Sequence, residues 1–182
     1  KPPPLLPLQQ GRRLLDAADV VVYAGSLVNT ALLDGIKAVC HDSAAMDLEA
    51  IMQVLAKGHR EGLRVVRLHT GDPAIYGAIR EQMQWLDAVG IPYEVVPGVS
   101  SAFAASAALK KELTVPEVTQ TVILTRQAGR TPVPERESLV RLAAVQATMC
   151  IFLSVALIER VVADLLSGGY PVDTPIAVVE RA

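Results

Sequence analysis

The sequence predicts an α/β protein built on a mainly parallel sheet with helices on both faces. Short apolar runs rich in β-branched residues, typical of buried strands, alternate with longer amphipathic stretches typical of helices. Such alternation is the pattern of strand–helix–strand units, whose strands run parallel. Strands are expected at residues 19–23, 63–68, 93–96, 119–124, 147–153 and 176–179. Helices are expected at 12–18, 48–57, 75–89, 102–109, 135–144 and 156–166.

A change of composition divides these elements into two domains. Charged residues and a proline interrupt the apolar pattern over residues 110–116. We therefore expect an N-terminal α/β domain over residues 1–114 and a C-terminal α/β domain over residues 115–182. With 182 residues, 51% of them hydrophobic, the chain is long enough for one large domain or two small ones that share a core.

The loop after the expected strand 63–68 contains Gly71-Asp72-Pro73. Gly71 has no Cβ, so the backbone can come close to a ligand there, and Pro73 suits the entry to a helix. Loops at the carboxyl ends of strands are where open α/β sheets bind small ligands. Taken by itself, however, Gly-Asp-Pro is also common in ordinary turns.

Two more loops strengthen the prediction of a ligand site. Pro97-Gly98-Val99-Ser100-Ser101 follows the expected strand 93–96 and leads into a helix of small residues. Hydroxyl and N–H groups at the start of a helix can hold an anionic group. A third glycine, Gly25, follows the expected strand 19–23. The three strand ends should open on the same side of one sheet and form a ligand crevice.

Composition excludes several classes of function. The formal charge is −2 and aromatic residues make up 4% of the chain, so neither a basic surface nor stacking residues favour nucleic-acid binding. No apolar run reaches the length of about 18 residues that a membrane span needs. The amino end lacks the apolar core of a signal peptide. His41-Asp42 and His59 lack the spacing of metal ligands, so no metal site is expected.

The two cysteines, Cys40 and Cys150, lie far apart in the sequence, each in an apolar stretch. We interpret them as buried thiols of a protein in a reducing cytoplasm.

Five ordered motifs resemble the tetrapyrrole methylase family. The first three are residues 22–28 (VYAGSLV), 69–77 (HTGDPAIYG) and 97–101 (PGVSS). The other two, residues 120–126 (QTVILTR) and 129–135 (GRTPVPE), resemble one branch of that family. Members of this branch methylate the corrin precursor precorrin-4 or cobalt-precorrin-4 at C11 in cobalamin biosynthesis. The resemblance extends from Gly11 to Ala182.

The resemblance implies a two-domain methyltransferase, generally a homodimer, that binds S-adenosylmethionine between its domains and releases S-adenosylhomocysteine. Methyl transfer is an in-line displacement in which the sulfonium charge disappears, so backbone groups and alignment suit it better than a strong anion beside the sulfur. The resemblance points to no catalytic residue. It does imply a set of cofactor contacts: Thr70, Gly71, Asp72, Ile75, Ser100, Ser101, Leu153 and Ala182.

The tetrapyrrole substrate implied by the resemblance carries several carboxylates, which arginine can bind in a bidentate manner. Arg126 and Arg130 are the best candidates, with solvated loop charges as the alternative. His69 and Tyr23 could also line the substrate site, although a structural histidine and a packed tyrosine explain them as well. Three further basic residues, Arg67, Arg80 and Lys110, are expected to be surface charges.

The chain departs from the family pattern at both ends. Family members usually begin with a strand and a Gly-Ala-Gly-Pro-Gly-Asp-Pro loop, whereas residues 1–10 contain no glycine, and members continue beyond the position of Ala182. We therefore expect a truncated chain, and an inactive fragment is one alternative. Methylation of another tetrapyrrole carbon, or of ribosomal RNA, is a second. A dinucleotide-binding oxidoreductase is disfavoured, because no Gly-x-Gly-x-x-Gly follows an expected strand.

Overall fold

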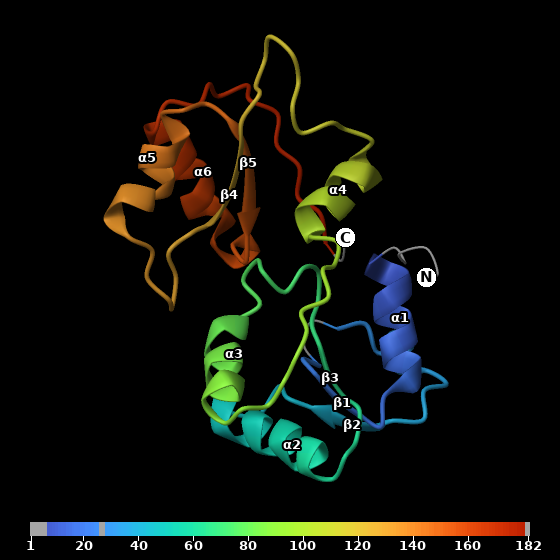
Figure 1. The fold of residues 1–182 in the computed structure, drawn as a ribbon. Coiled ribbons are helices and arrows are strands. Elements are labelled where there is room, and N and C mark those ends of the chain that lie inside the picture. The colour runs from blue at the N-terminus through green and yellow to red at the C-terminus, as the bar shows by residue number, and fades with distance from the viewer. Residues whose placement is uncertain (1–6, 26–27, 181–182) are drawn as a thin grey trace. The chain divides into compact units, whose positions relative to one another are not determined.

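The computed structural model describes residues 7–25 and 28–180, and the chain divides into two compact units, residues 1–101 and 102–182 (Figure 1). The division falls after Ser101, whereas the sequence predicts a domain boundary after Thr114. The helix over residues 101–109 and the polar stretch behind it lie between the two positions. The boundary at residue 114 therefore stays a prediction.

The first unit contains a parallel sheet of three strands, in the order β2-β1-β3. Strand β1 (Val20–Tyr23) lies in the centre and pairs with β2 (Val39–Asp42) and β3 (Val65–Leu68). The last residue of β1, Tyr23, is paired with the last residue of each neighbour. All three strands thus end at the same edge of the sheet, as parallel α/β topology requires. Strand β2 was not expected from the sequence.

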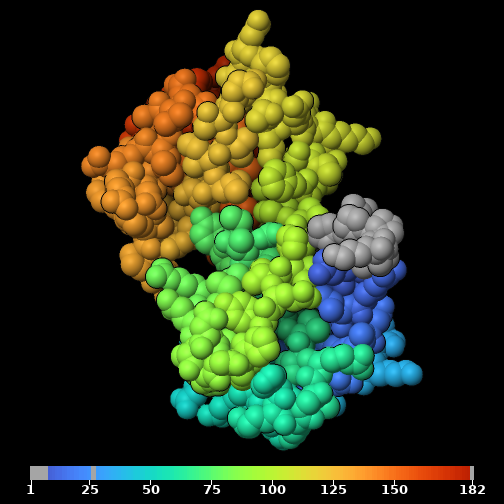
Figure 2. Space-filling model, viewed as in Figure 1, coloured from blue at the N-terminus to red at the C-terminus, as the bar shows by residue number. Residues whose placement is uncertain are grey.

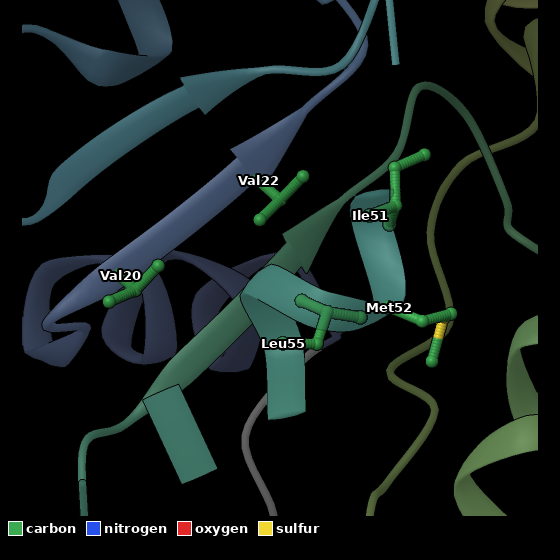
Figure 3. Packing of buried hydrophobic residues seen from close by; sticks show 5 residues of the cluster. All are labelled: Val20, Val22, Ile51, Met52 and Leu55. Atoms are coloured by element: carbon green, nitrogen blue, oxygen red, sulfur yellow. The ribbon is translucent and has the colours of Figure 1, made fainter. Parts of the chain in front are cut away.

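Helices cover both faces of this sheet, as predicted. Successive side chains of β1 point to opposite faces, so Val20 and Val22 lie on one face and Val21 on the other. Val20 and Val22 form a buried cluster with Ile51, Met52 and Leu55 of α2 (Leu48–Arg60), as Figure 3 shows. The partly buried Trp85 and Leu86 of α3 (Ile79–Ala88) pack against the same cluster. On the opposite face, Val21 packs with Ala18 and with Leu15 of α1 (Pro7–Ala17).

The second unit contains a parallel pair of strands, β4 (Val122–Arg126) and β5 (Thr148–Phe152). Its helices are α5 (Leu139–Ala143) and α6 (Ile158–Ser167), which pack together, and α4 (Ser101–Leu109), which begins at the division between the units. The segment between α4 and β4 stands out from this unit as a loop (Figures 1 and 2). A single bridge between Val115 and Thr119 closes its tip, where Val118 is exposed.

Two of the predicted strands are wrong. Residues 93–96 and 176–179 have no strand assignment, and Tyr93, Val95, Ile176 and Val178 are exposed. Both runs have the apolar composition of a strand. A strand also needs ladder hydrogen bonds to a neighbour, and among the described residues neither run forms them.

The helix predicted at 75–89 begins later, at Ile79. Tyr76 and Ala78 have φ angles of 56° and 50°, and these left-handed conformations prevent the helix from starting earlier. The helix predicted at 135–144 is split into a 3₁₀ turn (Glu135–Glu137) and α5, because Ser138 between them is extended, with ψ of 148°.

The prediction that both cysteines are buried is wrong for Cys40, which is exposed, whereas Cys150 is half-buried. Cys40 lies on β2, which pairs only with β1 at the edge of the sheet, so its side chains receive little cover. Neither thiol forms a disulfide.

No helix among residues 7–25 and 28–180 is long and apolar enough to cross a membrane.

Candidate functional site

The first unit brings two of the predicted ligand loops together at the carboxyl edge of its sheet. The backbone N–H of Gly98 donates a hydrogen bond to Oδ2 of Asp72, 2.9 Å away. Asp72 belongs to the loop that follows β3, and Gly98 belongs to the loop before α4. The prediction that these two loops form one site is therefore supported by direct contact, although no strand precedes the second loop.

The two glycines of this junction are required for different reasons. A Cβ on Gly98 would lie 2.0 Å from the carbonyl oxygen of Gly71, so the backbones of the two loops touch there. At Gly71 a Cβ would meet only ordinary contacts at 3.7 Å, but φ is +67°, a conformation that side chains rarely adopt. The close approach of a ligand to the backbone at Gly71 stays a prediction, and the structure adds a close contact within the chain between Gly98 and Gly71.

Asp72 uses both carboxylate oxygens within the chain. Oδ1 accepts the backbone N–H of Ala74 at 2.9 Å, which closes a turn, and Oδ2 accepts the N–H of Gly98. Its carboxylate therefore connects the two loops.

The other predicted cofactor contacts differ in their exposure. Thr70 is exposed and Ile75 is half-buried in the loop after β3, while Ser101 is exposed as the first residue of α4 and Ser100 beside it is buried. Leu153 lies in the second unit, directly after β5. It is 71% exposed and has a φ of 53°, an uncommon conformation for a leucine that recurs at functional sites. Ala182 lies outside the described residues.

A half-buried arginine, Arg67, lies near the predicted His69. Arg67 Nη1 donates to the carbonyl oxygens of Val22 at 3.1 Å and of Leu68 at 3.5 Å, while its Nε is buried without a hydrogen-bond partner among the described residues. The prediction that Arg67 is a surface charge is therefore wrong. The reason is its place on β3, where the side chain reaches the end of β1 instead of solvent. Burial lowers the pKa of the Arg67 guanidinium.

His69 is half-buried at the end of β3. Burial, and then the nearby charge of Arg67, lower the pKa of its imidazole from 6.5 to about 4. At neutral pH His69 is thus an uncharged hydrogen-bonding group at the edge of the site.

The predicted substrate residues occupy varied positions. Tyr23 packs against the cluster of Leu15, Ala18 and Val21, and its carbonyl oxygen accepts the hydroxyl of Ser43 at 2.9 Å. In the second unit, Arg126 donates to the carbonyl oxygens of Thr131 at 2.9 Å and of Pro132 at 2.8 Å. These two hydrogen bonds stabilise the loop that follows β4. Arg130 in the same loop is exposed and forms no ion pair within the described part of the chain.

Sequence reasoning missed Asp42, which it considered only as a metal ligand. Its Oδ1 accepts the N–H of Ala44 at 2.8 Å and the N–H of Gly25 at 3.0 Å. A signal was present in the sequence: Asp42-Ser43-Ala44 and Asp72-Pro73-Ala74 share the order Asp-x-Ala after a strand.

Two buried polar residues of the second unit, Gln127 and Ser154, were also missed. The N–H of Gln127 donates to the hydroxyl oxygen of Ser154 at 2.9 Å, and this hydroxyl donates to the carbonyl oxygen of Phe152 at 2.6 Å. These hydrogen bonds connect the carboxyl ends of β4 and β5.

These groups can bind and align a ligand. The two loops meet through backbone groups at Gly71 and Gly98, with the exposed side chains of Tyr76 and Val99 in the same loops. Within residues 7–25 and 28–180, no group of three or more His, Cys, Asp or Glu side chains could hold a metal ion. A reaction that depends on alignment of a bound cofactor fits such a surface.

The family model described as Tetrapyrrole (Corrin/Porphyrin) Methylases matches residues 5–182. The chain therefore belongs to the tetrapyrrole methylase family. It is 55% identical to the cobalt-precorrin-4 C(11)-methyltransferase of Methanocaldococcus jannaschii, over 95% of this chain and 68% of that protein. It is 51% identical to the precorrin-4 C(11)-methyltransferase of Pseudomonas aeruginosa, over 95% of this chain and 69% of that protein.

A more distant relative is the S-adenosyl-L-methionine-dependent uroporphyrinogen III methyltransferase of Methanosarcina barkeri, 35% identical over 98% of this chain and 73% of that protein. Among solved structures, a cobalt-precorrin-4 methyltransferase of cobalamin biosynthesis superposes with a TM-score of 0.85 at 50% identity. It covers 88% of this chain, which in turn covers 68% of that structure. The predicted α/β methylase fold is thereby confirmed.

Proposed function

We propose that this protein transfers a methyl group from S-adenosylmethionine to C11 of precorrin-4 or cobalt-precorrin-4, in cobalamin biosynthesis. The observation that carries the proposal is the identity of about one half, over 95% of the chain, to two relatives named for this reaction. One relative is named for the cobalt-containing substrate and the other for the cobalt-free one, so both forms remain in the proposal.

The loops at the carboxyl edge of the first unit fit a nucleoside cofactor. Bound S-adenosylmethionine would supply an electrophilic methyl group. We expect Thr70, Gly71 and Ile75 to hold it from the loop after β3, and Ser100 and Ser101 to hold it from the start of α4. Asp72 keeps these two loops in contact through its bond to Gly98. Leu153 and Ala182 are the contacts proposed from the second unit.

The test of the cofactor is a pair of calorimetric titrations on the full-length protein. S-adenosylhomocysteine should bind and NAD should not, because a methylase site recognises the adenosyl thioether. Binding of NAD alone would contradict the proposal and favour an oxidoreductase. Methylation of uroporphyrinogen III instead of precorrin-4 would support the alternative that another tetrapyrrole carbon is the target. Cofactor binding without turnover of either substrate would support an inactive form.

We further propose that Arg130 and Arg126 bind carboxylates of the substrate, and that His69 and Tyr23 are further substrate contacts. Arg130→Ala should weaken substrate binding about 10- to 100-fold, as loss of a charge-assisted hydrogen bond does. Arg130→Lys should restore only part, because an ammonium group cannot replace the guanidinium fork. The affinity for S-adenosylhomocysteine should stay unchanged.

Arg126→Ala should weaken substrate binding similarly and also loosen the loop at Thr131 and Pro132. Arg136→Ala is the matched control, because Arg136 is an exposed arginine of the same unit that is paired with Glu137. Equal losses in Arg130→Ala and Arg136→Ala would mean that overall charge, and not a specific contact, attracts the substrate.

We also propose that the enzyme is a homodimer of the cytoplasm. The compartment is supported by two thiols outside any disulfide, of which Cys40 is exposed. The dimer is supported by large apolar side chains that are exposed to solvent in a single chain, such as Val39, which is 61% exposed, and Val172, which is 90% exposed.

A further inference from the structure

Two aspartates close turns in the same manner at the carboxyl edge of the sheet in the first unit. Asp42 is the last residue of β2, and Asp72 lies in the loop that follows β3. Each carboxylate accepts the backbone N–H of the alanine two residues later, at 2.8 Å for Ala44 and 2.9 Å for Ala74. These bonds fix the direction of each carboxylate relative to its own loop.

Each carboxylate also accepts an N–H group from a glycine in a different loop. Gly25, in the loop after β1, donates to Asp42 over 3.0 Å, and Gly98, before α4, donates to Asp72 over 2.9 Å. The partners are 17 and 26 residues apart in the sequence. We name the pairs Asp42–Gly25 and Asp72–Gly98 the Asp–Gly latches.

Neither glycine has room for a side chain. A Cβ on Gly25 would lie 2.1 Å from Oδ2 of Asp42, and a Cβ on Gly98 would lie 2.0 Å from the carbonyl oxygen of Gly71. The close approach lets a short aspartate reach the backbone directly. Hydrogen bonds from an N–H group to a carboxylate are also stronger than those to a neutral acceptor.

We propose that Asp42 and Asp72 are positioning residues, which hold the loops at Gly25 and Gly98 in the arrangement that binds the cofactor. This inference rests on the proposed methyltransferase function for its effect on binding, but the latches themselves are observed in the fold. Asp72 acts through Gly98 and not through its own carboxylate, because both oxygens are already bonded within the chain. Pre-arranged loops save the ordering that a flexible site would need on binding.

The test replaces Asp72 by its amide, because its two bonds use different oxygens, and Asp42 by alanine, because its Oδ1 accepts both bonds. In Asp72→Asn the side-chain oxygen can still accept from Ala74, but an NH₂ group then faces the N–H of Gly98. Hydrogen exchange at the Gly98 amide, measured by NMR in the absence of ligand, should be at least about tenfold faster than in the unchanged protein. The affinity for S-adenosylhomocysteine should fall about 10- to 100-fold. Asp42→Ala, which removes the oxygen Oδ1 that accepts both N–H groups, should accelerate exchange at Gly25 and weaken the same affinity.

Asp19→Asn is the matched control. Asp19 accepts the backbone N–H of Arg64 at 2.9 Å, but it immediately precedes β1, at the amino edge of the same sheet. Its replacement should lower the thermal midpoint of unfolding without changing cofactor affinity or exchange at Gly25 and Gly98. A fall in cofactor affinity in Asp19→Asn equal to that in Asp72→Asn would overturn the positioning role, since general destabilisation would then explain both.

A double variant separates positioning from direct contact. If Asp72 acts through Gly98, then Asp72→Asn combined with Gly98→Ala should bind cofactor no more weakly than the worse single variant. Additive losses would instead assign Asp72 an independent contact with the cofactor and overturn the inference. Unchanged exchange at Gly98 in a folded Asp72→Asn protein would also overturn it. If the unchanged protein fails to bind S-adenosylhomocysteine, the proposed function is wrong, and the exchange rates alone decide on the latches.

Discussion

At the scale of single residues, the candidate site depends on backbone geometry and on buried charge. Gly71 adopts a left-handed conformation, and Gly98 has no space for a Cβ, so both positions are restricted independently of any ligand. Arg67 places a half-buried guanidinium at the ends of β1 and β3, and the lowered pKa of the nearby His69 keeps its imidazole uncharged at neutral pH. Replacement of His69 or Gly98 should therefore change the stability of the folded protein.

The stability of the protein should depend on the protonation of His69. The folded pKa of about 4 lies below the unfolded value of 6.5, so between these pH values the unfolded chain binds more protons. Stability should therefore rise with pH across this window and be lost as pH falls through it. We expect about 1–2 kcal/mol, reduced from the full shift because solvent reaches this half-buried ring.

Urea unfolding at several pH values between 4 and 7 measures this dependence. His69→Gln, which cannot be protonated, should flatten the slope in that window. His59→Gln serves as a control for the loss of an exposed imidazole. If His69→Gln retains the slope of the unchanged protein, other groups cause the pH dependence.

Gly98→Ala should destabilise the protein by about 1–3 kcal/mol, because the added Cβ would overlap the backbone oxygen of Gly71 and force the two loops apart. The comparison is Gly11→Ala, in helix α1, where a Cβ would meet nothing within 4 Å. That change should stabilise by about 0.5–1 kcal/mol, as alanine favours helix over glycine. Denaturant midpoints of the two variants should therefore move in opposite directions, and equal midpoints would refute the predicted overlap.

At the scale of elements, the central strand β1 organises the first unit. Its alternating valines bury one face against α2 and the other against α1, which is why four residues are sufficient to define two hydrophobic clusters. Helix α2 begins at Leu48 because Asp47 accepts the N–H of Ala50 at 2.8 Å and caps the first turn. Its buried Ile51, Met52 and Leu55 form one cluster with Val20 and Val22 of β1 (Figure 3).

Met52→Ala should cost about 2–5 kcal/mol of unfolding free energy, because Met52 is fully buried and its truncation leaves a cavity against β1. Leu48→Ala on the same helix should cost less than about 1 kcal/mol, since Leu48 is 42% exposed. Chemical denaturation of both variants provides the comparison. Similar losses would mean that the cluster around Met52 is not the core of this unit.

At the scale of the whole molecule, much apolar surface is exposed in a single chain. Strand β2 pairs on one side only, and its Val39 is exposed, as are Phe103 on α4 and Val118 in the loop before β4. Large apolar side chains that are exposed in a single chain can be covered by another protein surface. The amount of such surface is a property of the assembled fold, because the hydropathy of a residue does not determine whether it is covered.

Light scattering at micromolar concentration should give a mass twice that of one chain, as expected for a twofold dimer that buries apolar surface. The measurement should be repeated at high salt, where hydrophobic association persists while interactions between exposed charges are screened. A monomeric mass under both conditions would contradict the proposed homodimer.

The sequence by itself determined the parallel α/β class, the helices on both faces and the family. These follow from hydrophobic periodicity and from glycine-containing motifs, which are local and can be recognised without coordinates. The loops at Gly71 and Gly98 were predicted to share a site, and their hydrogen bond through Asp72 supports this. The contacts proposed for Leu153, Arg126 and Arg130 stay predictions.

Tertiary structure alone decided what depends on a distant partner. The apolar runs at 93–96 and 176–179 have strand composition but form no ladder among the described residues, and Arg67 is half-buried because β3 lies beside the end of β1. The exposure of Cys40 follows from the edge position of β2. Asp42 and Asp72 bond glycines 17 and 26 residues away, and periodicity says nothing about which loops meet. Hydrogen bonding and burial are pairwise properties of the folded chain, whereas composition is a property of each segment alone.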